Sequence, residues 1–235
     1  MCGRFTLSTD LDELQIQFSG FTFPDDVPPR FNIAPSQEIF VIRNIEDNVV
    51  DLLRWGLVPF WAKDAKIGNR MINARGETVA EKPSFRNAFK KRRCLILADG
   101  FYEWRREPEQ KTKTPMFIRL RSGKPFAFAG LWETWKVEGE ASLNTCTIIT
   151  TQPNSLMESI HNRMPVILPP EAYEFWLSSE EQPADVLLKW LQPYPEEWMT
   201  AHPVSRMVNS PATDKPECIE PVEIREEPPS QSSLF

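Results

Sequence analysis

Glycine is scarce in this sequence, and long apolar runs are absent. The 235 residues include only 9 glycines against 22 prolines, a composition that favours rigid turns and short elements over long helices. No run of 18 apolar residues occurs, and the N-terminus has neither the basic nor the apolar region of a secretory signal. We therefore expect no membrane span and a cytoplasmic location.

Patterns typical of metal sites and disulfides are also missing. The four cysteines, Cys2, Cys94, Cys146 and Cys218, lie far apart and show no CxxC spacing, which argues against a zinc site or a disulfide framework. Only two histidines are present, so a histidine-rich metal site is disfavoured. We expect the protein to use neither a metal nor another cofactor.

The runs that are present are mostly strand-like. Two pairs of apolar, β-branched runs lie at hairpin spacing, 38–45 with 49–57 and 115–121 with 125–131. The chain contains no internal repeat and no domain linker. We predict a single α+β domain over residues 1–225, built on a curved, mainly antiparallel, barrel-like β-sheet with short peripheral helices. Residues 226–235, acidic and polar, are predicted to form a disordered tail.

Charge is distributed unevenly along the chain. The net charge is −6, yet residues 62–93 carry ten lysines and arginines against three acidic residues, a local charge of +7. We call residues 62–93 the basic segment. Residues 171–235 are acidic. A basic segment on such a chain is typical of a phosphate-binding face, although a solvated helix surface has the same composition.

The cysteine at position 2 could carry two nucleophilic groups. Removal of Met1 would leave an α-amine and a thiol on one residue, with ordinary pKa values of about 7.7–8.0 and 8.5. An aldehyde is the characteristic partner of this pair, because the amine forms an imine and the thiol then closes a five-membered thiazolidine without a cofactor. Alternatively, Cys2 is an unremarkable residue near a frayed terminus.

Three further polar residues suit chemistry on such an adduct. Asn73 can orient an amine or a sugar oxygen, or it is an ordinary buried amide. Glu103 lies among aromatic residues, where desolvation would raise its pKa towards neutrality and suit it to acid–base work, unless it is an exposed residue of an edge strand. His161 is a natural proton shuttle near neutral pH, or a structural histidine.

Trp61 follows Phe60 on a loop that leads into the basic segment. An exposed tryptophan at this place could stack on a nucleic-acid base or wedge between two bases. The alternative is a core residue, since the chain has eight tryptophans and most of them must be buried.

The chain contains five motifs in the order Met1–Phe5, Arg30–Pro35, Ile72–Thr78, Ala98–Trp104 and His161–Pro165. In this order they resemble the motifs of the SOS-response-associated peptidase family of abasic-site processing proteins. With the segment 202–205 included, the resemblance extends from residue 2 to about residue 207. One difference is Asn162, where the family usually has aspartate after the histidine.

The resemblance implies a sensor of abasic sites in single-stranded DNA that shields the lesion as a covalent crosslink. It implies that Cys2 captures the sugar aldehyde as a thiazolidine, Asn73 holds the amine and the sugar oxygen, and Glu103 acts as the acid–base group. His161 would assist ring opening and crosslink reversal. The same resemblance implies removal of Met1 by the protein itself, strand-cleaving lyase activity, and a set of DNA contacts: Arg4, Pro35, Ser36, Trp61, Arg75, Arg86, Thr150 and Arg163.

Two other classes of function remain open from the residues alone. One is a cysteine peptidase that uses the Cys2 thiol with Glu103 and His161, and the other is a passive single-strand binding module that uses Trp61 and the basic segment. For the crosslinking function, which we favour, we expect a monomer whose partner is single-stranded DNA with an abasic site, a nucleoid association, and no membrane or metal partner.

Overall fold

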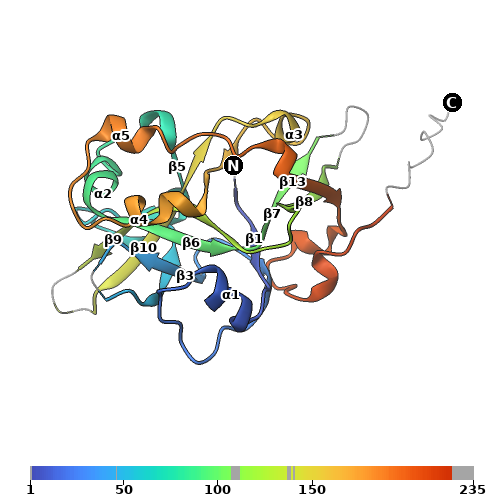
Figure 1. Ribbon diagram of the computed structural model, residues 1–235, viewed down its shortest axis with the longest axis horizontal. Coiled ribbons are helices and arrows are strands. Elements are labelled where there is room, and N and C mark those ends of the chain that lie inside the picture. Colours follow the sequence, from blue (N-terminus) through green and yellow to red (C-terminus); the bar gives the residue numbers. More distant parts are fainter. Residues whose placement is uncertain (1, 46, 107–111, 137–138, 140, 224–235) are drawn as a thin grey trace, which may run out of the picture.

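The computed structural model describes residues 2–45, 47–106, 112–136, 139 and 141–223. Met1 and the predicted tail 226–235 lie outside these described residues. Within them the chain forms two β-sheets surrounded by short helices (Figure 1). In the described part of the chain, no helix has the length and apolar character needed to cross a membrane.

The smaller sheet contains five antiparallel strands and includes the N-terminal strand at an inner position. Its order is β13–β8–β7–β1–β2, so β1 pairs with both β7 and β2. The bounds are β1 Phe5–Leu7, β2 Arg30–Ile33, β7 Gly100–Arg105, β8 Thr114–Leu120 and β13 Met199–Pro203.

The larger sheet closes on itself. Strand β10 pairs antiparallel with β9 and parallel with β4, which completes a ring through β3 and β6. Strands β5, β11 and β12 pair with members of this ring at its margins. The bounds are β3 Glu38–Arg43, β4 Val50–Trp55, β5 Asn73–Arg75, β6 Arg93–Ala98, β9 Phe126–Trp135, β10 Leu143–Thr151, β11 Met164–Pro165 and β12 Ile167–Leu168. The prediction of a mainly antiparallel, barrel-like α+β fold is therefore confirmed.

Helices are short and peripheral, as the proline content predicted. Asp10 caps the first α-helix by accepting from the Glu13 amide, and Asn154 caps the third by accepting from the Met157 amide. The α-helices are α1 Leu11–Gln17, α2 Arg86–Lys91, α3 Ser155–Glu158, α4 Tyr173–Trp176 and α5 Ala184–Leu188. The 3₁₀ helices are η1 Ala65–Arg70, η2 Gly76–Thr78, η3 Pro170–Ala172, η4 Glu196–Trp198, η5 Arg206–Asn209 and η6 Pro216–Cys218.

Aromatic side chains join the two sheets. Phe5 of β1 packs edge-on against Trp55 of β4, with ring centroids 5.2 Å apart, and against Phe128 of β9 at 5.8 Å. Phe101 of β7 contacts the same Phe128 at 6.0 Å. The strand that follows Cys2 is thereby packed against the barrel core, which gives Cys2 a defined position in the fold.

One of the two predicted hairpins is wrong. Strands β3 and β4 form the first hairpin, with Val41 opposite Asp51. Strands β8 and β9, which flank Ser122–Lys124, belong to different sheets: β8 pairs with β7 and β13, and β9 pairs with β6 and β10. The turn signal was present, but alternation along a strand reports which face is buried and does not identify the partner strand.

Candidate active site and nucleic-acid interface

Four segments that are distant in sequence meet near the N-terminus. Cys2 precedes β1, Asn73 begins β5, Glu103 lies in β7 and His161 follows α3. The Tyr102 amide donates to the Arg4 carbonyl at 2.9 Å, which aligns the N-terminal segment with β7. Asn73 Nδ2 donates to the Cys2 carbonyl at 2.7 Å. Strand pairing thus positions Asn73 and Glu103, and the hydrogen bond from Asn73 positions Cys2.

Cys2 is completely buried. Its Sγ lies 3.9 Å from the Arg4 carbonyl oxygen. Burial raises the pKa of the Cys2 thiol well above its ordinary value, and the nearby Glu103 carboxylate raises it further. The thiol is therefore held in its neutral form, and the interpretation of Cys2 as a frayed terminal residue is wrong.

Glu103 and His161 face each other with Oε2 and Nε2 4.0 Å apart. Glu103 is only 3% exposed because β7 lies between β1 and β8, so the alternative of an exposed edge-strand residue is wrong. Burial raises the pKa of the Glu103 carboxyl and lowers the pKa of the His161 imidazole. The uncharged forms of both groups are favoured, so Glu103 retains a proton that it can give to a substrate near neutral pH.

The orientation of the His161 ring is defined by a backbone group. The Arg163 amide donates to His161 Nδ1 at 3.1 Å. An amide can only donate, so Nδ1 accepts and the proton of the neutral ring resides on Nε2, the atom that faces Glu103.

An open hollow of about 690 Å³ lies beside His161. Its lining includes His161 and Asn162 together with Arg75, Thr78, Glu77 and Arg163. Arg75 is exposed and available to a ligand. Asn73, at the start of the same strand, has a buried Oδ1 without a hydrogen-bond partner, so one acceptor close to Cys2 remains available.

Arg163 is tightly held. Its guanidinium makes a bidentate ion pair with Glu77, at 2.6 and 2.9 Å, and donates to the Thr150 carbonyl at 2.7 Å. Thr150 has no exposed surface. In this conformation Thr150 supports Arg163 instead of presenting an atom to a DNA strand.

Trp61 lies on the surface. Its side chain is 50% exposed, and the adjacent Phe60 is 54% exposed, so the core alternative for Trp61 is wrong. Ser36 is also exposed, with a left-handed φ of 73°, and donates to Asn69 Oδ1 at 3.1 Å, while Pro35 is partly buried beside it. These three predicted contacts remain accessible.

The basic segment is only partly available to a ligand. Arg92 is paired with Glu133 at 2.7 Å, and Arg93 is fully buried, where it donates to carbonyls including those of Trp176 and Ser178. The remaining eight basic side chains are exposed: Lys63, Lys66, Arg70, Arg75, Lys82, Arg86, Lys90 and Lys91. These eight exposed cations are compatible with both interpretations of the basic segment, a solvated surface and a phosphate-binding face.

Arg4 is not on the surface. It is 8% exposed and donates to Asn32 Oδ1 at 2.7 Å and to the Val208 carbonyl at 2.6 Å, and its guanidinium lies 5.9 Å from the Trp104 ring centroid. In this arrangement Arg4 anchors the segment that carries Cys2. Its predicted contact with DNA would require this network to rearrange.

Two partners in these networks were not identified from the sequence. Glu77 was counted only as an acidic residue within the basic segment. Asp214 accepts from the amides of Phe31 and Asn32 and pairs with Arg30, although it lies more than 180 residues away from them. Only the motif position of Glu77 could have drawn attention to it, because pairing over such separations leaves no local pattern.

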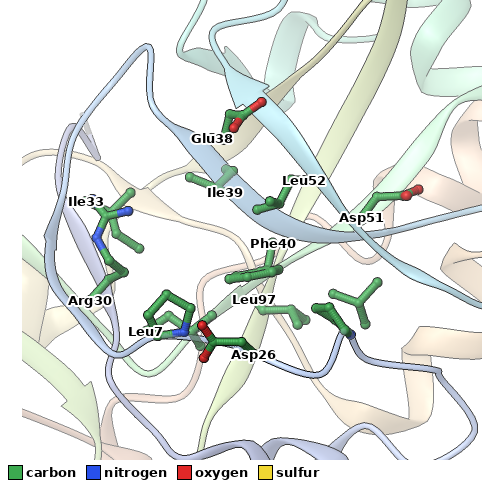
Figure 2. A pocket seen from close by; sticks show the side chains of 13 residues that line it. Leu7, Asp26, Arg30, Ile33, Glu38, Ile39, Phe40, Asp51, Leu52 and Leu97 are labelled. Carbon is green, nitrogen blue, oxygen red and sulfur yellow. The ribbon is translucent and has the colours of Figure 1, made fainter.

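A second hollow, of about 410 Å³, lies between β3, β4 and the loop before β2 (Figure 2). Its floor is apolar, with Leu7, Ile39 and Leu97, and Asp51 at its rim is paired with Arg43. Its lining includes no cysteine or histidine, whereas His161 lines the first hollow. Among the described residues, no cluster of three or more His, Cys, Asp or Glu side chains could hold a metal ion.

The matches to known proteins cover all the segments that form this site. Residues 1–211 match the model of the family described as SOS response associated peptidase (SRAP). The chain is 52% identical over 223 residues to abasic site processing protein YoqW of Bacillus subtilis (strain 168), covering 94% of this chain and 99% of that protein. It is 32% identical over 250 residues to abasic site processing protein HMCES of Mus musculus, covering 89% and 70% respectively. A solved structure from Bacteroides thetaiotaomicron superposes with a TM-score of 0.84 at 27% identity, covering 94% of this chain and all of that one.

Proposed function

Because this chain belongs to the SOS-response-associated peptidase family, we propose that it captures abasic sites in single-stranded DNA as a covalent adduct on Cys2. Its relatives are abasic site processing proteins, and abasic-site processing is the general function that it shares with them. The observation that carries the finer proposal is the meeting of Cys2 with Asn73 and of Glu103 with His161 around the N-terminal segment, with His161 in the wall of an open hollow.

The first step exposes the aldehyde. An abasic sugar is mostly a closed hemiacetal, so one proton must reach the ring oxygen while the anomeric hydroxyl loses another. The protonated Glu103 carboxyl can give its proton to the ring oxygen while its other oxygen accepts the proton of the anomeric hydroxyl, and the Nε2–H of neutral His161, 4.0 Å away, stabilises the carboxylate between the two transfers. The pKa directions support this assignment, because burial favours the uncharged form of both groups.

The second step forms the crosslink. The Cys2 α-amine adds to the aldehyde carbon, and loss of one water molecule gives an imine. The thiol sulfur then bonds to the same carbon, while the thiol proton moves to the nitrogen, so that a thiazolidine forms without any oxidant or reductant. Asn73 Nδ2 holds the Cys2 carbonyl, and its unpartnered Oδ1 can accept from the amine.

A free α-amine on Cys2 requires hydrolysis of the Met1–Cys2 peptide bond. We propose that the protein performs this removal itself, with Glu103 and His161 as the nearby acid–base groups.

The imine also activates the sugar for loss of its β-phosphate, so strand cleavage competes with ring closure. Reversal would return the nitrogen proton to sulfur with the help of the same groups, which breaks the C–S bond and regenerates the imine; addition of one water molecule then releases the aldehyde and the Cys2 amine.

A general cysteine peptidase fits the site less well. Catalytic cysteines of peptidases have a lowered pKa because a histidine stabilises the thiolate. Here burial and Glu103 raise the pKa of the Cys2 thiol. An amine that attacks first and a thiol that closes the ring while still neutral are compatible with that environment.

The proposal is tested by intact-mass spectrometry of the purified protein, before and after incubation with a single-stranded oligonucleotide that contains one abasic site. We expect loss of Met1 and a heat-stable one-to-one adduct. Cys2→Ala should bind the strand without gaining its mass, and an oligonucleotide without the lesion should give no adduct. Retention of Met1, or non-covalent binding alone by the wild type, would refute the thiazolidine mechanism.

A further inference from the structure

The ion pair between Glu77 and Arg163 connects the two halves of the proposed site. Glu77 lies in η2, directly after β5, the strand that carries Asn73 and through it holds Cys2. Arg163 lies two residues after His161. The bidentate geometry, at 2.6 and 2.9 Å, fixes both the distance and the relative orientation of these two segments.

Arg163 depends on this carboxylate. Its side chain is 16% exposed, so its charge needs a partner that compensates for lost hydration. Besides Glu77, its guanidinium donates to the Thr150 carbonyl at 2.7 Å and to Thr150 Oγ1 at 3.3 Å, and its Nε is buried without a partner. Removal of Glu77 would leave only the Thr150 contacts, and the loop 161–163 would lose its ionic anchor.

The same loop sets the protonation of His161. The Arg163 amide can donate to Nδ1 only while that nitrogen is unprotonated, so the 3.1 Å hydrogen bond favours the neutral ring and leaves its proton on Nε2, facing Glu103. The charged groups that act on this ring are Glu103 opposite Nε2, the cations Arg163 and Lys113, and the α-amino group.

We infer that Glu77 is a positioning residue for the proposed reaction: by clamping the Arg163 side chain, it holds the Arg163 amide on His161 Nδ1 and the Nε2 proton towards Glu103. This inference rests on the proposed function for its chemistry. Its structural content concerns the protein without DNA, so it can be measured separately.

The test is an NMR titration of His161 in DNA-free protein carrying Glu77→Gln. Gln retains the shape of the side chain but cannot form the ion pair. Loss of the amide hydrogen bond should raise the His161 titration midpoint by about 0.5–1 unit. Loss of the Glu77 charge alone would lower the midpoint, so a rise shows that the Arg163 segment has moved away from the His161 ring. The chain has one other histidine, His202, bonded to the Ile219 carbonyl, and it serves as an internal reference.

Glu81→Gln is the matched control, because Glu81 is an exposed acid four residues further along. Adduct formation should slow about tenfold in Glu77→Gln and remain unchanged in Glu81→Gln. Glu77→Asp, which keeps the charge but shortens the reach, should give an intermediate rate and keeps the test valid if the Gln variant fails to fold.

A His161 midpoint that falls or does not move, with an unchanged adduct rate, would overturn the positioning role. A wild-type protein that forms no adduct would instead refute the proposed function, while the titration would still decide whether Glu77 controls His161. The two failures are therefore distinguishable.

Discussion

At the residue scale, the burial of Glu103 favours its use as an acid but lowers the stability of the folded protein when the carboxyl ionises. Its carboxyl is 3% exposed and faces the His161 ring. Burial penalises the charged form and raises the pKa of the carboxyl. A residue that retains a proton near neutral pH is useful as an acid, yet the folded protein must lose stability if the same group ionises in place.

We expect Glu103→Gln to stabilise the protein at pH 7 but not at pH 4. A raised folded pKa means that the folded state binds the proton more tightly than the unfolded state does. No cost exists below the unfolded pKa, and stability is lost as the pH rises through the raised folded pKa. At pH 7 the free energy of unfolding of the variant should therefore be about 1 kcal/mol larger than that of the wild type. Calorimetry should show this as a melting temperature a few degrees higher.

Glu38→Gln provides the control, since Glu38 is exposed at the start of β3. It should leave the melting temperature within about 1 °C at both pH values, in keeping with the small effects of surface substitutions. An equal shift in Glu103→Gln at pH 4 and pH 7 would show that ionisation of Glu103 is not the cause.

At the element scale, a close contact between two glycines holds the loop that presents Trp61. Gly56 directly follows β4 and has a φ of 129°, and a Cβ on it would lie 2.7 Å from the Gly68 carbonyl oxygen in η1. The Gly56 amide also donates to the Cys146 carbonyl at 2.8 Å. The loop that includes Trp61 therefore starts and ends at a contact with the barrel that leaves no room for a side chain.

Gly56→Ala should be strongly destabilising. The left-handed φ and the clash with backbone atoms act together, so we expect a loss of about 3 kcal/mol and a melting temperature lower by about 6–12 °C. Affinity for single-stranded DNA should fall as well, because the loop with Trp61 is displaced. Thermal unfolding and fluorescence anisotropy measure the two effects.

Gly123→Ala is the comparison for this prediction. Gly123 has a φ of 74° but nothing within 4 Å of an added Cβ, so only the conformational term of about 1 kcal/mol applies. If both variants lost the same stability, the steric contact between Gly56 and Gly68 would not be the determinant.

At the scale of the whole molecule, an acidic protein exposes a basic surface. The chain has a net charge of −6, but eight cations of the basic segment are exposed. Arg86 at the start of α2 is one of them, and α2 lies on the barrel side of the molecule, away from β8 (Figure 1). The local charge, and not the net charge, governs the attraction of a phosphate backbone.

Arg86→Ala should weaken binding of single-stranded DNA and reduce the slope of log K against log salt by about 0.7, the value for one neutralised phosphate on a single strand. The measurement is a series of anisotropy titrations at increasing salt. Arg121→Ala removes an exposed arginine just after β8 and should leave the slope unchanged. Equal slopes for wild type and Arg86→Ala would exclude Arg86 as a phosphate contact.

The features predictable from the sequence were those encoded locally. Alternating apolar residues around a polar turn predicted the hairpin of β3 and β4, and the caps Asp10 and Asn154 stand where their side-chain types favour helix starts. The candidate residues Cys2, Glu103 and His161 could be named because each requires a particular functional group, and a functional group is visible in a sequence.

Tertiary structure alone decided which of these groups face one another and which charges are free. Pairing of β10 with both β9 and β4 closes the barrel, β8 and β9 separate into different sheets, Arg93 is buried, and Glu77 takes Arg163 as its partner. These outcomes depend on contacts between residues far apart in the chain. Local periodicity and charge counts determine burial and composition, whereas a partner is selected by the packing of the whole molecule.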